Sequence, residues 1–206
     1  MASNAAAYDT LPSLDSARLA AFALGCAERG SGIFLALAGQ EEADRLSSLL
    51  ERAWLAAAGE GDDAEIADIV EEFEARAEAS SDGTDSLDAA YFLLHAEYLS
   101  VLALAIQIQP SSELGEETGE MLENLLHIID QRLSGVRSVT VAAGEPTPTG
   151  PLQQIEHAAQ DRTLRALAEL PGSDRLTPEF LTELRASFVP QRDEIASATA
   201  LLFSEP

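Results

Sequence analysis

The chain has 206 residues, which suits one compact domain with a buried core, or at most two small domains. Acidic side chains outnumber basic ones 36 to 12, so the formal net charge is −24, and every basic residue is an arginine. This charge repels nucleic acid and anionic membranes, which we therefore do not expect as partners, and the single cysteine, Cys26, excludes a disulfide framework and a multi-cysteine zinc site.

The acidic excess has two interpretations. It is typical of a surface that attracts a basic partner or imitates nucleic acid, and it is also typical of a helical protein that uses carboxylates for solubility. Abundant Ala, Leu, Glu and Arg without lysine match the codon bias of a GC-rich bacterial genome. Composition alone leaves both interpretations open.

Residues 1–12 lack the basic and apolar regions of a secretory signal. We therefore expect them to form a disordered arm and not a signal peptide. With a lone cysteine, this predicts a cytoplasmic protein. Helical spacing of apolar residues begins after Ser13 and Asp15, either of which can cap a helix. Gly30 and Gly32 are expected to bend or break this first helix.

Three amphipathic or apolar segments follow, over residues 41–57, 64–79 and 86–109. The third is apolar on nearly every face, which predicts a central helix surrounded by others. Its length fits a membrane span, but His95, Glu97 and Ser100 lie in its middle and no basic flank is present. We therefore expect it inside a soluble bundle.

The second half repeats the helical pattern around an exposed Pro/Gly-rich loop at residues 134–150. Helices are expected over residues 112–133, from Pro151 to Leu170, and from a cap at Thr177 onward, with a kink at Pro190. The prediction is an all-α fold, a single multi-helix bundle of about seven helices around a central apolar helix, spanning residues 13–206.

Cys26, Glu28 and Arg29 bring a thiol, an acid and a base together within four residues. Neighbouring helical residues point about 100 degrees apart, so Glu28 and Arg29 cannot pair and Arg29 needs a carboxylate from another helix. Cys26 lies on the inward stripe without a histidine base in its own helix. The pattern favours a packed thiol and a structural ion pair over a catalytic site.

The three histidines do not form a metal motif. A di-metal carboxylate bundle needs Glu three residues before each His, whereas Phe92, Asn124 and Gln154 stand there. The i,i+4 pairs Glu123 with His127 and His157 with Asp161 supply too few ligands. We expect no metal, no cofactor and no catalytic residues, and we assign Asp88 and His95 as core polar groups, like Arg29.

Two stretches, "LDSARLAAFALGCAERGSGIFLALAG" and "LSSLLERAWLAA", resemble the N-terminal half of the YjaG-like family of helical bacterial proteins. "DSLDAAYFLLHAEYL" is similar to the family's central helix, and "PLQQIEHAAQDRTLRALAEL" to its late Gln-rich helix. The Gly30-Ser31-Gly32 stretch and the Pro-rich loop depart from the family pattern. The resemblance implies an all-helical fold and carries over no catalytic residues.

These observations favour a non-enzymatic acidic protein-binding module, such as an immunity or inhibitor protein that neutralises a basic effector toxin. The alternative hypothesis is a helical-bundle enzyme or metal-binding protein with a pocket around His95 and Asp88, and a third is a homodimerising structural protein. The candidate contacts for a basic protein partner are acidic residues on helix faces: Glu41, Glu42, Asp44, Asp62, Asp63, Glu71, Glu72, Glu74, Glu113, Glu116, Glu117 and Glu120.

Overall fold

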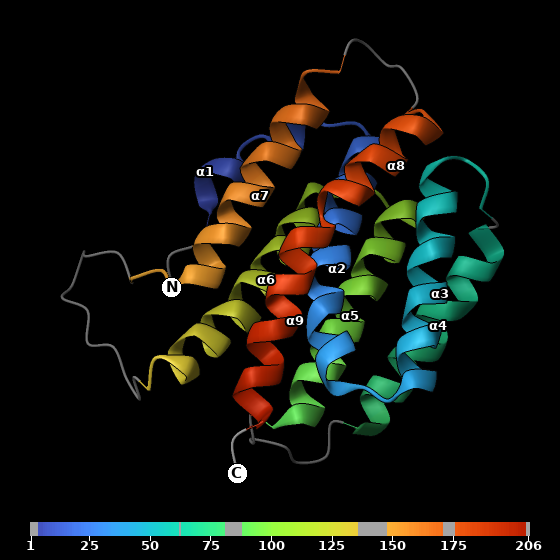
Figure 1. Ribbon diagram of the computed structural model, residues 1–206. Coiled ribbons are helices and arrows are strands. Elements are labelled where there is room, and N and C mark those ends of the chain that lie inside the picture. The colour runs from blue at the N-terminus through green and yellow to red at the C-terminus, as the bar shows by residue number, and fades with distance from the viewer. Residues whose placement is uncertain (1–3, 62, 81–87, 136–147, 171–175, 205–206) are drawn as a thin grey trace.

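The computed structural model describes residues 4–61, 63–80, 88–135, 148–170 and 176–204. These residues form helices and their connections with no strand among them, which confirms the predicted all-α bundle (Figure 1). A 3₁₀ turn, η1 (Leu11–Ser13), precedes the first long helix. The helices are α1 (Ala5–Tyr8), α2 (Ser16–Leu37), α3 (Gln40–Ala57), α4 (Asp63–Ser80), α5 (Ala89–Ile108), α6 (Ser112–Leu133), α7 (Pro151–Ala168), α8 (Pro178–Ser187) and α9 (Val189–Ser204).

Side-chain caps start several of these helices. Asp15 accepts a hydrogen bond from the Arg18 backbone N–H at the start of α2, and Thr177 does the same for Phe180 at α8. Each bond satisfies a backbone donor that the first helical turn leaves unpaired. Helix boundaries therefore agree closely with those read from capping residues.

Helix α2 lies at the centre of the bundle and contacts α3, α5, α6, α7, α8 and α9. It is continuous through Gly30 and Gly32, so the predicted break is wrong. A Cβ at Gly30 would lie 2.6 Å from Leu99 Cδ1 of α5, and one at Gly32 would overlap the Arg192 carbonyl oxygen of α9. These glycines allow neighbouring helices to approach closely, which offsets their low helix propensity.

Helix α5 is more apolar than α2 but less enclosed. Both helices are long and apolar enough to cross a membrane by length and composition. In the most apolar 18-residue stretch of each helix, 89% is buried in α2 and 56% in α5. Small residues, rather than the highest hydropathy, thus determine which helix the others surround. The predicted central position of residues 86–109 belongs instead to α2.

The first residues do not form a loose arm from Asn4 onward. Tyr8 is 5% exposed and Leu11 is 1% exposed, and both belong to the core. A Cβ at Gly119 of α6 would lie 2.5 Å from the Tyr8 hydroxyl, so that glycine makes the space into which Tyr8 inserts. The arm prediction is therefore wrong for residues 4–12, and residues 1–3 lie outside the described part.

The chain ends in two helices where one kinked helix was expected. Helix α8 ends at Ser187 and α9 begins at Val189, with Phe188 buried at the junction. Pro190 lies in the first turn of α9, where its missing N–H has no helical acceptor in any case. This division gives eight long helices in the described residues. Of the predicted loop at 134–150, residues 136–147 lie outside them.

Candidate functional site

A buried ion pair joins the central helix to α7. Glu156 accepts two hydrogen bonds from Arg29, at 2.7 Å from Nε and 2.6 Å from Nη2, and both side chains are completely inaccessible to solvent. The Phe188 ring lies 4.9 Å from the Arg29 guanidinium carbon, in cation–π contact. Burial by itself would lower the pKa of Arg29. The charge and hydrogen bonds of the Glu156 carboxylate act in the opposite direction, and the pKa of Arg29 is raised. Glu156 is the carboxylate from another helix that Arg29 was expected to need.

The thiol beside this pair is unsuited to nucleophilic chemistry. Cys26 is fully buried, and its sulfur accepts a hydrogen bond from Arg29 Nη2 at 3.4 Å. Burial raises the pKa of Cys26 to about 12, despite the opposing effect of the guanidinium. A thiol that stays protonated and inaccessible is a packing residue.

Glu28 binds the C-terminal helices. Its carboxylate accepts hydrogen bonds from Trp54 Nε1 at 3.1 Å, Arg185 Nε at 3.0 Å and Arg192 Nη1 at 3.3 Å. Arg185 also forms an ion pair with Glu51 of α3. Glu28 and Arg29 therefore serve two separate ion pairs on different faces of α2, as the helical geometry predicts.

A second buried carboxylate, Glu123 of α6, holds the N-terminal segment. It accepts hydrogen bonds from the Tyr8 hydroxyl at 2.6 Å and the Asn4 backbone N–H at 3.3 Å, and His157 Nε2 lies 3.4 Å away. The bond to Glu123 raises the pKa of His157, against the effect of burial. Sequence spacing paired Glu123 with His127, but the structure pairs it with the histidine of another helix.

His127 takes part in a chain of side-chain hydrogen bonds with Gln131 and Gln153. Gln131 donates to its Nε2 at 2.7 Å, and its Nδ1–H donates to the Gln153 side-chain oxygen at 3.0 Å. Among the described residues, no group of three or more His, Cys, Asp and Glu side chains has the arrangement of a metal site. The donors that the sequence contains are thus distributed among separate contacts.

Asp88 and His95 do not form a shared polar centre in the core. Asp88 is exposed and caps α5 by accepting a hydrogen bond from the Tyr91 N–H, so its assignment as a core group is wrong. His95 is half-buried, its Nδ1–H donates to the Tyr91 carbonyl at 2.8 Å, and its ring lies 4.0 Å from the Tyr91 ring. Each side chain serves the start of its own helix.

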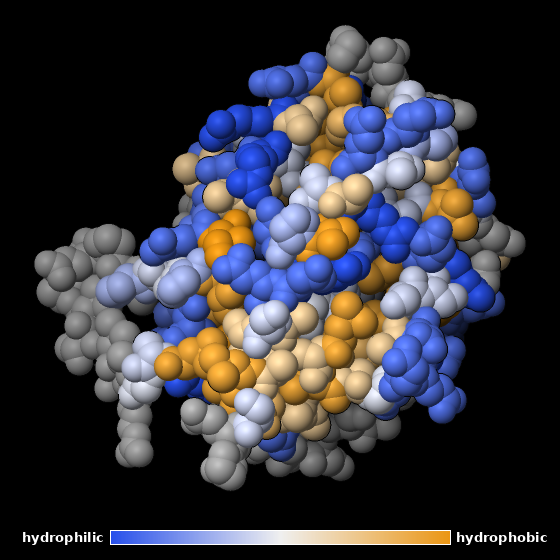
Figure 2. All heavy atoms as spheres, in the orientation of Figure 1, coloured by the Kyte–Doolittle hydropathy of each residue, from blue (hydrophilic) through white to orange (hydrophobic). Residues whose placement is uncertain are grey.

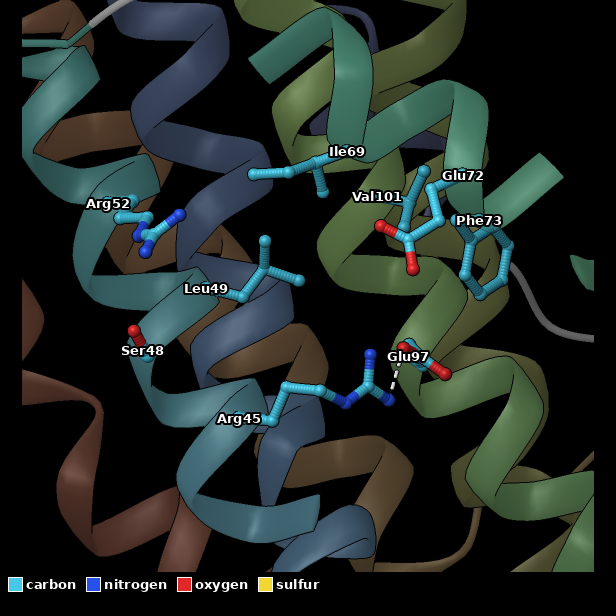
Figure 3. A pocket seen from close by; sticks show the side chains of 9 residues that line it. All are labelled: Arg45, Ser48, Leu49, Arg52, Ile69, Glu72, Phe73, Glu97 and Val101. Carbon is cyan, nitrogen blue, oxygen red and sulfur yellow. Dashed lines mark ion pairs between the residues drawn. The ribbon is translucent and has the colours of Figure 1, made fainter. Parts of the chain in front are cut away.

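A groove of about 270 Å³ lies between α3, α4 and α5 (Figure 3). Arg45 crosses it to form an ion pair with Glu97 at 2.7 Å, and the Glu97 side chain is only 11% exposed. Leu49, Ile69, Phe73 and Val101 supply apolar walls. Both signs of charge line this groove, and neither Asp88 nor His95 does.

Eight of the acidic residues that were predicted to contact a partner are exposed and pair with no arginine in the part of the chain that the structure describes. None of Glu41, Glu42, Asp44, Glu71, Glu72, Glu113, Glu116 and Glu117 forms an ion pair with a described residue, and all are exposed. Glu120 is half-buried, Asp62 lies outside the described residues, and so do the side chains of Asp63 and Glu74.

Sequence reasoning missed several residues that hold helices together. Asp130 of α6 accepts hydrogen bonds from the Leu152 and Gln153 N–H groups and so caps α7 from outside that helix. Glu123, Glu156 and Tyr8 were missed as well, because their partners lie more than 100 residues away in the chain. A polar residue on the inward stripe of an amphipathic helix is the one pattern that marks them.

Comparison with protein-family models, with curated proteins and with solved structures gave no match for this chain.

Proposed function

We propose that this chain is a non-enzymatic protein-binding module that binds a basic protein through its acidic surface. The observation that carries the proposal is the distribution of charge. Among the described residues, Asp15, Glu28, Glu51, Glu97, Glu156 and Asp193 form ion pairs with arginines, whereas the exposed predicted contacts form none: Glu41, Glu42, Asp44, Glu71, Glu72, Glu113, Glu116 and Glu117. These exposed carboxylates are therefore available to attract a basic protein partner.

The interior supports a binding role over a catalytic one. Cys26 and Glu156, which have nucleophilic or acid–base potential, are enclosed and both hydrogen-bonded to the buried Arg29. Their arrangement joins α2 to α7 through a buried ion pair, which is a structural role.

We further propose that the binding is inhibitory, as for an immunity protein that blocks a basic effector toxin in the bacterial cytoplasm. Electrostatic attraction gives such an inhibitor the fast association that it needs. A lone, buried thiol is compatible with a reducing compartment. Membership of the YjaG-like family is part of the same proposal and rests on the sequence stretches given above.

The test is affinity purification of the tagged chain from the cells that make it, washed first at low and then at high salt. The expected result is a basic protein that is retained at low salt and released at high salt. The Glu41→Lys/Asp44→Lys variant should retain less of it. The matched control is Glu179→Lys/Glu183→Lys, which makes the same charge change on α8, where both residues are exposed. Equal retention by both variants, or no basic protein at all, would contradict the proposal.

A further inference from the structure

The second half of the last helix carries no charge and exposes apolar side chains. Residues Ile195–Ser204 include no acidic or basic residue. Ile195 and Thr199 face inward, at 1% and 0% exposure, whereas Leu201 is 58% exposed. A leucine so exposed, on a chain with a net charge of −24, marks a surface that is not organised for solubility alone.

Neighbouring helix ends extend this surface. Leu35 in the last turn of α2 is 41% exposed, and Leu133 at the end of α6 is 39% exposed. Figure 2 shows hydrophobic side chains gathered over the ends of α2, α6 and α9 that lie together at the bottom of Figure 1. We call Leu35, Leu133 and Leu201, with the small residues between them, the lower apolar face.

Contacts between α2 and α9, and of α6 and α9 with α5, hold the helices that carry this face. The α9 backbone at Arg192 and Ala196 lies against Gly32 of α2. Near the end of α9, Phe203 packs edge-on against Phe92, with ring centroids 5.5 Å apart, and Arg132 of α6 lies over the same ring. The three leucines therefore lie on helices that pack against one another or against α5.

Acidic side chains border the lower apolar face on its α3 and α9 sides, whereas Arg132 lies next to Leu133 on the α6 side. The chain turns from α2 into α3 immediately beyond it, and Glu41 and Asp44 in the first turns of α3 are exposed. Glu194 is exposed on α9 at the point where its uncharged half begins, and it forms no ion pair with a described residue. An apolar surface with an acidic border is complementary to a helix with an apolar stripe and basic flanks.

We propose that the lower apolar face docks an amphipathic helix of the basic partner, with lysine or arginine on either side of its apolar stripe. This inference rests on the proposed function and names the part of the partner that is bound. A second copy of this chain is a poor occupant, because it would bring the same acidic border against itself. The apolar face supplies the contact area, and the acidic border orients the bound helix of the partner.

The test uses a fluorescein-labelled peptide of about 18 residues, five helical turns, built from leucine at helical spacing and lysine elsewhere. Its control has the same composition in an order with no apolar stripe. Fluorescence anisotropy measures the binding of each peptide to the intact chain at low and at high salt. We expect the amphipathic peptide to bind at least about tenfold more tightly than its control.

Substitutions with aspartate separate the two contributions. Leu35→Asp and Leu201→Asp each add negative charge, so electrostatics alone would tighten peptide binding, whereas loss of apolar contact weakens it. The matched control is Leu55→Asp, because Leu55 is 42% exposed and lies, like Leu35, in the last turn of its helix. We expect the first two to weaken binding at least about tenfold and the control to change it less than about twofold. Circular dichroism and thermal melting check that each variant is folded.

Each other outcome overturns a defined part of the argument. Equal binding of both peptides, or unchanged binding by Leu35→Asp and Leu201→Asp, overturns docking at the lower apolar face and leaves acidic-surface binding standing. A dimer by sedimentation that Leu201→Asp dissociates shows that a second copy is the occupant. If neither peptide binds at low salt, the result contradicts the proposed function as well.

Discussion

Replacing Arg29 with methionine should destabilise the protein severely. Arg29→Met leaves Glu156 completely buried and without its counter-charge, since the remaining described neighbours supply no second guanidinium to this carboxylate. Removing one partner of a buried ion pair lowers the free energy of unfolding by about 3–5 kcal/mol. The whole free energy of unfolding of a native domain is about 5–15 kcal/mol. The variant should lose about a fifth or more of the free energy of unfolding.

Urea unfolding followed by circular dichroism measures this loss. With a denaturant slope of roughly 2–3 kcal/mol/M, the midpoint should fall by roughly 1–2 M. The double variant Arg29→Met/Glu156→Met removes both charges together and should recover most of the loss, to within about 1 kcal/mol of the wild type. The coupling energy of this double-mutant cycle reports the pair itself.

Arg185→Met is the matched control. Glu28 keeps Arg192 and Trp54 when Arg185 is removed, and Arg185 is 29% exposed, so the expected cost is only about 1 kcal/mol. If Arg29→Met costs no more than Arg185→Met, or if the double variant is less stable than the single one, the assignment of Glu156 as a stranded buried charge is refuted.

Three further predictions follow from the same contacts. Gly32→Ala should lower the free energy of unfolding by on the order of 1–3 kcal/mol, because the new Cβ overlaps the α9 backbone. Gly115→Ala, whose Cβ would have its nearest neighbour at 3.5 Å, should be neutral or stabilising, and thermal unfolding compares the two variants. Cys26 should not react with a disulfide reagent at pH 8 until the chain is unfolded in urea, and rapid labelling of the native protein would disprove its enclosure. The pKa of His157 is raised in the folded state, so its contribution to stability is fully present below pH 6.5 and is lost as the pH rises through the folded pKa. His157→Gln should remove this part of the pH dependence of urea unfolding.

The sequence contains the information for helix boundaries but not for tertiary pairing. Asp15, Thr177 and Pro178 act within a few residues of their own positions, so capping rules place these helix starts correctly. Arg29 and Glu156 are separated by 127 residues, and the inward position of Glu156 on its helix does not identify its partner. The sequence predicts that Arg29 needs a partner, and only the fold selects which carboxylate it is.

Glycine was misread for a related reason. In a single sequence, Gly30 and Gly32 carry the pattern of a helix break, since glycine lowers helix propensity by about 1 kcal/mol relative to alanine. Tertiary packing reverses the result, because Leu99 and the α9 backbone occupy the space that a side chain would take. The same close packing makes α2 central and leaves the more apolar α5 partly uncovered, which a ranking by hydropathy does not detect.

The position of the uncharged surface bears on why the chain is so acidic. Carboxylates selected only for solubility would be most useful beside exposed leucines, where association through apolar contact has to be suppressed. Here Ile195–Ser204 contains none, although Leu201 is the most exposed large apolar side chain among the described residues. The carboxylates instead border this surface at the start of α3 and in the first half of α9. Carboxylates beside an uncharged centre are the arrangement that the proposed docking of a basic helix requires, and bias in composition does not by itself select positions on a folded chain.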